Sequence, residues 1–227
     1  MLELLERNNV EFIGRRLDTK TNFSVIIDTK KKSRTIIAYK DEKNQKYVVP
    51  KLKTDWIYVA SMDKTCLSFL QELVNYAKKK KIKLAINPSM YFVKTAKRKL
   101  KKLLTNFEVV VMNKDEAEEL YGDYEKSGVK LLCVTDAKNG AEVFYEGHVY
   151  KHKVHNIKVV ERTGAGDAYA SMFVAAYIKG MPIETCCKVA LAQSESVISY
   201  YGATNKLLTW NELIKSKDIK VEKVKLT

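Results

Sequence analysis

Two glycines and an aspartate stand where an apolar stretch gives way to a helical pattern, in the segment VVERTGAGDAYASMFVAAYIKG at residues 159–180. Glycines allow backbone N–H groups to converge on a concave site that can hold an anion. The first turn of the following helix adds N–H groups that have no partner within the helix. Such a site stabilises the charge that develops on a phosphoryl group during its transfer.

Asp167 directly follows this glycine turn. Its carboxylate could accept the proton of an attacking hydroxyl while the amides of Gly164, Ala165 and Gly166 hold the phosphate. An aspartate at this position could instead cap the helix, which is a common role for this residue type. The local residues leave both interpretations open.

Two other phosphate-binding motifs are excluded. No G-x-x-x-x-G-K-[ST] pattern occurs, so the segment is not a P-loop. Tyr169 stands where G-x-G-x-x-G has its third glycine, which allows close packing of the helix on the strand. A dinucleotide-binding fold is therefore not expected.

The elements that must position this turn are strands and helices in alternation. This order predicts right-handed βαβ crossovers and a mostly parallel α/β sheet with helices on both faces. Ligands bind such sheets at the carboxyl ends of the strands, and a predicted strand at 157–160 would put the glycine turn there. Strands are predicted at 55–61, 82–88, 107–113, 130–136 and 157–160, hairpin strands within 138–154, and helices at 67–80, 94–104, 114–122, 165–178 and 182–200.

Residues 1–50 have a different pattern. The stretch FSVIIDTKKKSRTIIAYK at 23–40 alternates apolar and polar residues on both sides of a basic turn, which predicts a β-hairpin. A hairpin outside the main sheet is a candidate lid or the surface of a homodimer. An antiparallel edge of the main sheet is the alternative interpretation.

The net charge of +14 comes mostly from lysine. Nucleic-acid binding is one interpretation of this charge, but the basic stretch 94–104 interleaves leucines at helical spacing, as a surface helix does. No nucleic-acid-binding signature accompanies it, so this function is kept only as a lower-ranked alternative. A positive field also suits ligands that carry phosphates.

The remaining composition limits the other classes. His148 and His152 share one face of a predicted strand and His155 lies on the other, with no cysteine nearby to complete a zinc site. The four cysteines form no C-x-x-C motif and are expected to be reduced and mostly buried. Because neither a signal-peptide pattern nor an apolar run of transmembrane length is found, we expect a cytoplasmic protein without a membrane partner.

The segment ERTGAGDAYASMFVAAYI resembles the C-terminal signature of the ribokinase-like PfkB carbohydrate kinases. Further segments are similar to motifs of this family in the same order, and the resemblance covers nearly all of residues 1–210. It implies one ribokinase-like domain over 1–227, with a lid region at about 15–50, a core at 54–210 and a tail at 211–227. The similar segments are RTIIAYK, TDWIYVAS, LAINPS, VVVMNKDEAEEL, LLCVTDAKNGAEVFYEG and ALAQSESVISYYGA.

The resemblance implies ATP-dependent phosphorylation of a hydroxyl on a small sugar or nucleoside. Asp167 would be the general base, and Gly164, Ala165 and Gly166 would form the anion hole over the γ-phosphate. Asn113 and Glu116 would help to place Mg²⁺ and phosphates, with Glu116 acting on the metal through water. The remaining nucleotide-site residues implied by the resemblance are Thr135, Gly140, Thr163 and Gln193.

Several of these residues also have a local structural interpretation. Asn113-x-x-Glu116 is a capping box for the helix at 114–122, and both roles could hold at once. Thr135 and Gly140 could simply frame a tight hairpin. Ala137, Glu161 and Gln193 depart from the family pattern, which usually has Gly, Asp and Asn at these places.

The beginning of the chain departs most from the family. Members start with a βαβ region whose Gly-Gly stretch and early Asp hold the sugar, whereas MLELLERNNVEF resembles the helix just before the lid. Three outcomes are open: the sequence is a fragment, another chain supplies the missing part, or the protein binds nucleotide without phosphorylating a sugar.

Overall fold

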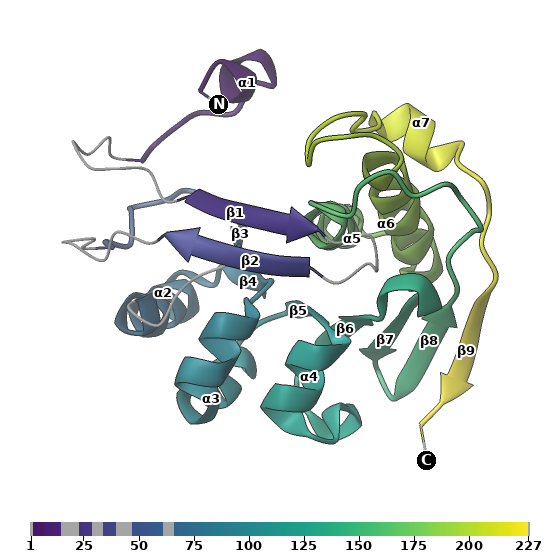
Figure 1. The fold of residues 1–227 in the computed structure, drawn as a ribbon. Coiled ribbons are helices and arrows are strands. Elements are labelled where there is room, and N and C mark those ends of the chain that lie inside the picture. Colours follow the sequence, from purple (N-terminus) through teal and green to yellow (C-terminus); the bar gives the residue numbers. More distant parts are fainter. Residues whose placement is uncertain (1, 15–22, 29–33, 40–46, 61–65, 227) are drawn as a thin grey trace. The chain divides into compact units, whose positions relative to one another are not determined.

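The computed structural model describes residues 2–14, 23–28, 34–39, 47–60 and 66–226. These residues divide into two compact units, 1–47 and 48–227. Figure 1 shows the ribbon coloured along the chain. None of the described helices combines the length and hydropathy needed to span a membrane.

The first unit contains the short helix α1 (Leu2–Arg7) and the antiparallel strands β1 (Phe23–Asp28) and β2 (Arg34–Tyr39). The hairpin prediction is confirmed, and the two strands form a sheet of their own rather than an edge of the larger sheet. The basic turn between them and much of the predicted lid region lie outside the described residues. Because the register pairs alternate residues, one face of the hairpin presents the exposed apolar side chains of Phe23, Val25, Ile27, Ile37 and Tyr39.

The second unit is built on a seven-stranded sheet, with the order β3-β4-β5-β6-β7-β8-β9 among the described strands. The first four strands are parallel, as predicted, and β6 to β9 are antiparallel neighbours. The bounds are β3 (Trp56–Val59), β4 (Lys83–Ile86), β5 (Val109–Asn113), β6 (Leu131–Thr135), β7 (Ala141–Tyr145), β8 (His148–His152) and β9 (Val221–Lys225).

Helices cover both faces of this sheet, which confirms the predicted α/β architecture (Figure 1). The alternation along β5 shows why: Val110 and Met112 join the core under α2, α3 and α4, while Val109 and Val111 join the core under α5 and α6. The helices are α2 (Leu67–Lys80), α3 (Met90–Leu104), α4 (Lys114–Tyr121), α5 (Ala165–Ile178), α6 (Ile183–Ile198) and α7 (Trp210–Ile214).

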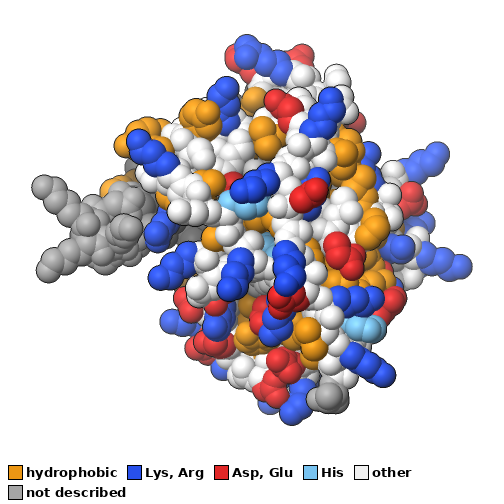
Figure 2. All heavy atoms as spheres, turned by 90° about the vertical axis from the view of Figure 1, so that its right-hand side faces the viewer, with side chains coloured by type: hydrophobic (Ala, Val, Ile, Leu, Met, Phe, Trp, Pro, Cys, Tyr) orange, Lys and Arg blue, Asp and Glu red, His pale blue; other side chains and the backbone are white. Residues whose placement is uncertain are grey.

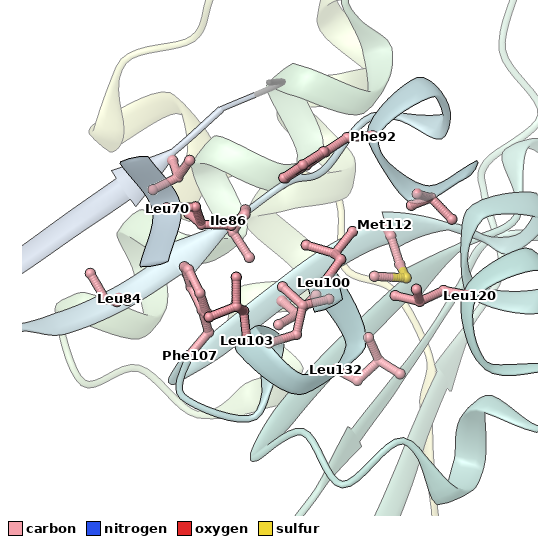
Figure 3. Packing of buried hydrophobic residues seen from close by; sticks show 14 of the residues in the cluster. Leu70, Leu84, Ile86, Phe92, Leu100, Leu103, Phe107, Met112, Leu120 and Leu132 are labelled. Carbon is pink, nitrogen blue, oxygen red and sulfur yellow. The ribbon is translucent and has the colours of Figure 1, made fainter. Parts of the chain in front are cut away.

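The core under α2, α3 and α4 contains residues whose helical spacing predicted burial. In α2 the buried residues Leu70, Leu73, Val74 and Ala77 recur every three or four positions. Figure 3 shows Leu70 near Ile86, and leucines of α3 packed on the sheet. The lysines of α3 therefore lie on the solvent side of an ordinary amphipathic helix.

One strand prediction is wrong. Residues 157–160 form no strand, although their apolar β-branched composition favoured one. The position beside β8 is occupied by β9 from the end of the chain. The backbone N–H of Val160 donates instead to Ile198 O at 2.8 Å, at the end of α6.

Positive and negative side chains alternate on the surface shown in Figure 2. Ion pairs join oppositely charged side chains on neighbouring strands, such as Lys151 of β8 and Glu142 of β7 at 2.6 Å. Mixed charges are typical of a solvated surface, whereas nucleic-acid-binding proteins concentrate basic residues on one stripe or face.

Candidate active site

Neighbouring strand ends bring three of the predicted site residues together. Asn113 ends β5, Thr135 ends β6, and the two residues are partners across the parallel ladder. Glu116 lies in the first turn of α4, the helix that begins directly after Asn113. The sheet therefore presents these residues at the carboxyl ends of its strands, where α/β proteins bind ligands.

Asn113 and Glu116 form the predicted capping box. Asn113 Oδ1 accepts from the N–H of Glu116 at 2.9 Å, and Glu116 Oε2 accepts from the N–H of Asn113 at 3.0 Å. Glu116 is only 7% exposed, and burial raises the pKa of its carboxyl group against the opposing effect of hydrogen bonds from Asn113 and the backbone of Met90. A carboxylate so held has a fixed orientation.

A tight turn after β6 lies next to this pair. The N–H of Asp136 donates to Gly140 O at 2.8 Å, and Asp136 forms an ion pair with Lys114 at 3.1 Å. Gly140 has φ +100°, and a Cβ there would stand 1.8 Å from His152 O. The prediction that Thr135 and Gly140 frame a tight turn is thus confirmed, and the turn joins β6 to β7.

The glycine turn before α5 begins with a residue in the left-handed conformation. Gly164 is the N-cap residue with φ +85°, and a Cβ there would lie within 2.9 Å of Ala203. The first α-helical hydrogen bond runs from the N–H of Ala168 to Gly164 O at 2.8 Å. Within the described part of the chain, no group accepts from the N–H of Gly166 or Asp167.

Asp167 is exposed in the first turn of α5, with its carboxylate outside the core. The negative charge of Asp167 acts on Tyr58 of β3. Burial is the larger cause and this charge the smaller one, and together they raise the pKa of Tyr58 to about 12. Asp167 therefore lies near the carboxyl end of β3. Sequence reasoning missed Tyr58, whose only signal was its place near the end of a predicted strand.

The other two predicted nucleotide residues lie around the glycine turn. Thr163 is half-buried directly before Gly164. Gln193 on α6 is 5% exposed, and its Oε1 accepts from the N–H of Leu208 at 2.9 Å. The next residue of α6, Ser194, donates its hydroxyl to Ala165 O at 3.0 Å, so α6 supports the first turn of α5 directly.

The histidines are dispersed among different contacts. His148 Nδ1 lies 2.8 Å from Glu146 O, and His155 Nδ1 lies 2.8 Å from Glu195 Oε2. His152 is buried, and its contacts are described below. Over residues 2–14, 23–28, 34–39, 47–60 and 66–226, no three His, Cys, Asp or Glu side chains gather as a metal site would require.

Comparison with known proteins gives the family of the chain. The model of the "pfkB family carbohydrate kinase" matches residues 1–210. The cytidine kinase of Thermococcus kodakarensis is 30% identical over 145 residues, which are 58% of this chain and 51% of that protein. The chain thus spans about half the length of the curated relatives that it matches.

Solved structures have the same fold. The nucleoside kinase of Methanocaldococcus jannaschii, an archaeal member of the ribokinase family, superposes with a TM-score of 0.78 at 21% identity over 94% of this chain and 74% of that one. A putative ribokinase II of E. coli in complex with ATP and Mg²⁺ gives a TM-score of 0.62 at 14% identity over 71% of this chain and 57% of that one. The strand order, the glycine turn and the match over residues 1–210 together assign the chain to the pfkB family of carbohydrate kinases, with the ribokinase-like fold.

Proposed function

We propose that this chain carries the phosphate-handling part of a kinase that transfers the γ-phosphoryl group of ATP to a hydroxyl of a small nucleoside or sugar. The observation that supports this proposal best is the first turn of α5. There the carboxylate of Asp167 is exposed, and the described residues offer no acceptor for the N–H groups of Gly166 and Asp167.

Asp167 acts as the general base. The acceptor hydroxyl gives its proton to the carboxylate while its oxygen bonds to the γ-phosphorus, and the bond from that phosphorus to the bridging oxygen breaks to release ADP. The N–H groups of Gly164, Gly166 and Asp167 stabilise the charge on the transferring group, whereas the N–H of Ala165, also assigned to the anion hole, already donates to Arg162 O at 3.3 Å. Gly164 contributes through its positive φ, which turns the chain into the helix.

The nucleotide and Mg²⁺ lie along the carboxyl ends of β5 and β6. A single buried carboxylate, Glu116, fits a metal that keeps most of its waters and takes its other ligands from phosphates. Its Oε2 is already bonded to Asn113, so we assign it to the water shell of Mg²⁺ rather than to the metal itself. Mg²⁺ neutralises phosphate charge when it is bound. The proposed nucleotide-site residues are Asn113, Glu116, Thr135, Gly140, Thr163 and Gln193.

We infer that nucleosides are the first acceptors to test. The support comes from similarity to proteins described as a cytidine kinase and a nucleoside kinase. Sugars remain in the proposal because the family as a whole is described as carbohydrate kinases.

We further propose that the β1–β2 hairpin is the lid and forms the contact of a homodimer. Its exposed face carries Phe23 at 59% exposure and Ile37 at 57%. Monomeric proteins rarely leave a contiguous apolar face of this kind in water. Sedimentation should then show a dimer that Phe23→Lys with Ile37→Lys converts to a monomer. A dimer that survives these charges would contradict this contact.

A second candidate function is nucleotide binding without transfer. Among the described strands, β3 pairs only with β4, so the side of Asp167 next to Tyr58 borders a sheet edge. Because β4 is the one described strand that pairs with β3, fewer groups are available on this side to hold an acceptor beside Asp167, and we test nucleotide binding and turnover separately.

The test is calorimetry with ATP and ADP, followed by an ADP-release assay with cytidine and other nucleosides, ribose and fructose phosphates. The kinase proposal predicts nucleotide binding together with ADP release that depends on one of these acceptors. Binding with no release for any acceptor would favour the second candidate. No binding of either nucleotide would contradict both.

A further inference from the structure

A buried hydrogen bond joins the helix that carries Asp167 to the end of β8. His152 Nε2 lies 2.8 Å from Tyr169 Oη, and the two rings stack with centroids 5.9 Å apart. Both residues are only 4% exposed. Because Tyr169 follows Asp167 by two residues in α5, this contact fixes the beginning of the helix against the sheet.

The direction of the bond follows from the second ring nitrogen. His152 Nδ1 lies 3.2 Å from Lys153 O, and a carbonyl oxygen can only accept. Nδ1 therefore carries the proton, Nε2 is the acceptor, and the hydroxyl of Tyr169 donates to it. Burial lowers the pKa of His152, which favours the neutral ring that this arrangement requires.

Two thiols complete the surroundings of the Tyr169 hydroxyl. Cys133 of β6 and Cys187 of α6 lie close enough to the hydroxyl to act on it electrostatically. Burial raises the pKa of Cys133 to about 12 and also raises the pKa of Cys187, so both remain S–H donors. Buried neutral groups of β6 and α6 thus surround the hydroxyl through which α5 contacts β8.

His152 also borders the turn after β6. The backbone of Gly140 approaches His152 O so closely that a Cβ would stand 1.8 Å from it. One residue therefore contacts both the helix that bears Asp167 and the turn that we assign to the nucleotide.

We propose that His152 and Tyr169 are positioning residues, whose hydrogen bond holds the first turns of α5, and with them Asp167, in a fixed place relative to the turn at Gly140. The kinetic consequence rests on the proposed kinase function. A proton added to Nε2 converts it into a donor, so that it can no longer accept from Tyr169. Besides Tyr169 and its two thiols, the titratable groups that act on His152 are Glu195, whose charge favours this proton, and His155, whose charge opposes it.

Three variants of the full chain test the proposal. Tyr169→Phe removes the donor, whereas His152→Gln keeps an acceptor that does not titrate. Tyr177→Phe is the matched control, because it removes a hydroxyl that contacts Glu108 at 3.2 Å from the far end of the same helix. All three are compared by hydrogen exchange at the amides of residues 168–170, relative to the core amides of β5 and β6.

Tyr169→Phe should speed exchange at 168–170 by roughly tenfold, the size expected for one buried hydrogen bond, with a smaller change in β5 and β6. His152→Gln and Tyr177→Phe should leave these amides within about twofold of the wild type. Equal acceleration throughout the core in Tyr169→Phe would overturn the proposal and leave a purely structural role. Nitrogen NMR should find His152 with its proton on Nδ1, and a proton on Nε2 at neutral pH would overturn the assignment.

The kinetic arm uses the ADP-release assay. Tyr169→Phe should lower kcat several-fold and leave the Kd of ATP nearly unchanged. His152→Gln should remove only the contribution of His152 to the acid limb of the wild-type pH profile, because the general base Asp167 is still present. Loss of nucleotide affinity in parallel with kcat would contradict positioning of Asp167. Should the wild type release no ADP with any acceptor, the kinase function fails, while the exchange experiment still decides whether the contact positions α5.

Discussion

Asn113 and Glu116 each donate a backbone N–H to the side chain of the other, at 2.9 and 3.0 Å. The two side chains therefore cap the N-terminus of α4, and they also lie at the edge of the sheet where we place the nucleotide. A capping role and a ligand role are compatible here, because helix N-termini attract phosphates as well as carboxylates.

Replacement of Glu116 by Gln tests how burial of this carboxyl group affects the stability of the fold. Burial raises the pKa of Glu116 above its ordinary value of 4.5, so the folded state holds its proton more tightly than the unfolded state does. That contribution to stability is present below about pH 4.5 and is lost as the pH rises through the folded-state pKa. In urea titrations, the stability of Glu116→Gln relative to the wild type should therefore increase between about pH 4 and pH 7. A difference that is constant with pH would contradict the burial effect.

The same variant tests the metal assignment. Glu116→Gln keeps an oxygen that can accept from Asn113 but loses the charge that orders the water shell of Mg²⁺. We expect calorimetry to show weaker binding of ATP with Mg²⁺, and nearly unchanged binding of ATP without it. Equal loss in both titrations would place Glu116 among purely structural residues.

Gly140→Ala should be much more damaging than Gly147→Ala. Both glycines have positive φ, but a Cβ at Gly140 would collide with His152 O, whereas none of the described residues comes within 4 Å of a Cβ at Gly147. We expect a loss of about 3 kcal/mol or more for Gly140→Ala, from overpacking added to strain, and about 1 kcal/mol for Gly147→Ala. Urea unfolding measures both. Similar losses would mean that the approach of β8 to this turn is not as close as the structure has it.

Ala137→Gly addresses a departure from the family pattern. Ala137 has φ +41°, a conformation that costs a residue with a Cβ about 1 kcal/mol. We expect Ala137→Gly to leave stability unchanged or raise it slightly, and to tighten ATP binding because the methyl group leaves the edge beside Thr135. Glu146→Gly, with φ +48° in the turn at the other end of β7, is the control for strain alone. Equal effects of the two variants on ATP affinity would contradict a role for Ala137 at the nucleotide.

The sequence was sufficient to predict features that local spacing determines. The buried positions of α2 and the capping box at Asn113 follow from periodicity and short-range hydrogen bonding. The parallel direction of β3 to β6 follows from the alternation of strands and helices along the chain. Features that depend on distant segments were not predictable in this way. Residues 157–160 form no strand, and the strand that pairs with β8 on its other side is β9, more than 60 residues later in the sequence. Tyr58 and Asp167 are more than 100 residues apart in the sequence, and only the folded chain shows that they interact.

The most direct test of the account is the turnover of Asp167→Asn. The acceptor is whichever nucleoside or sugar supports ADP release by the wild type. Asp115→Asn is the control for loss of one carboxylate at a helix N-terminus, because Asp115 is exposed in the first turn of α4. A general base contributes about 10²–10⁴-fold to a rate, so Asp167→Asn should lower kcat by at least about a hundredfold, with ATP still bound and the chain still folded. Turnover by Asp167→Asn equal to that of the wild type would contradict the assignment of Asp167 as the base and, with it, the proposed chemistry of the glycine turn.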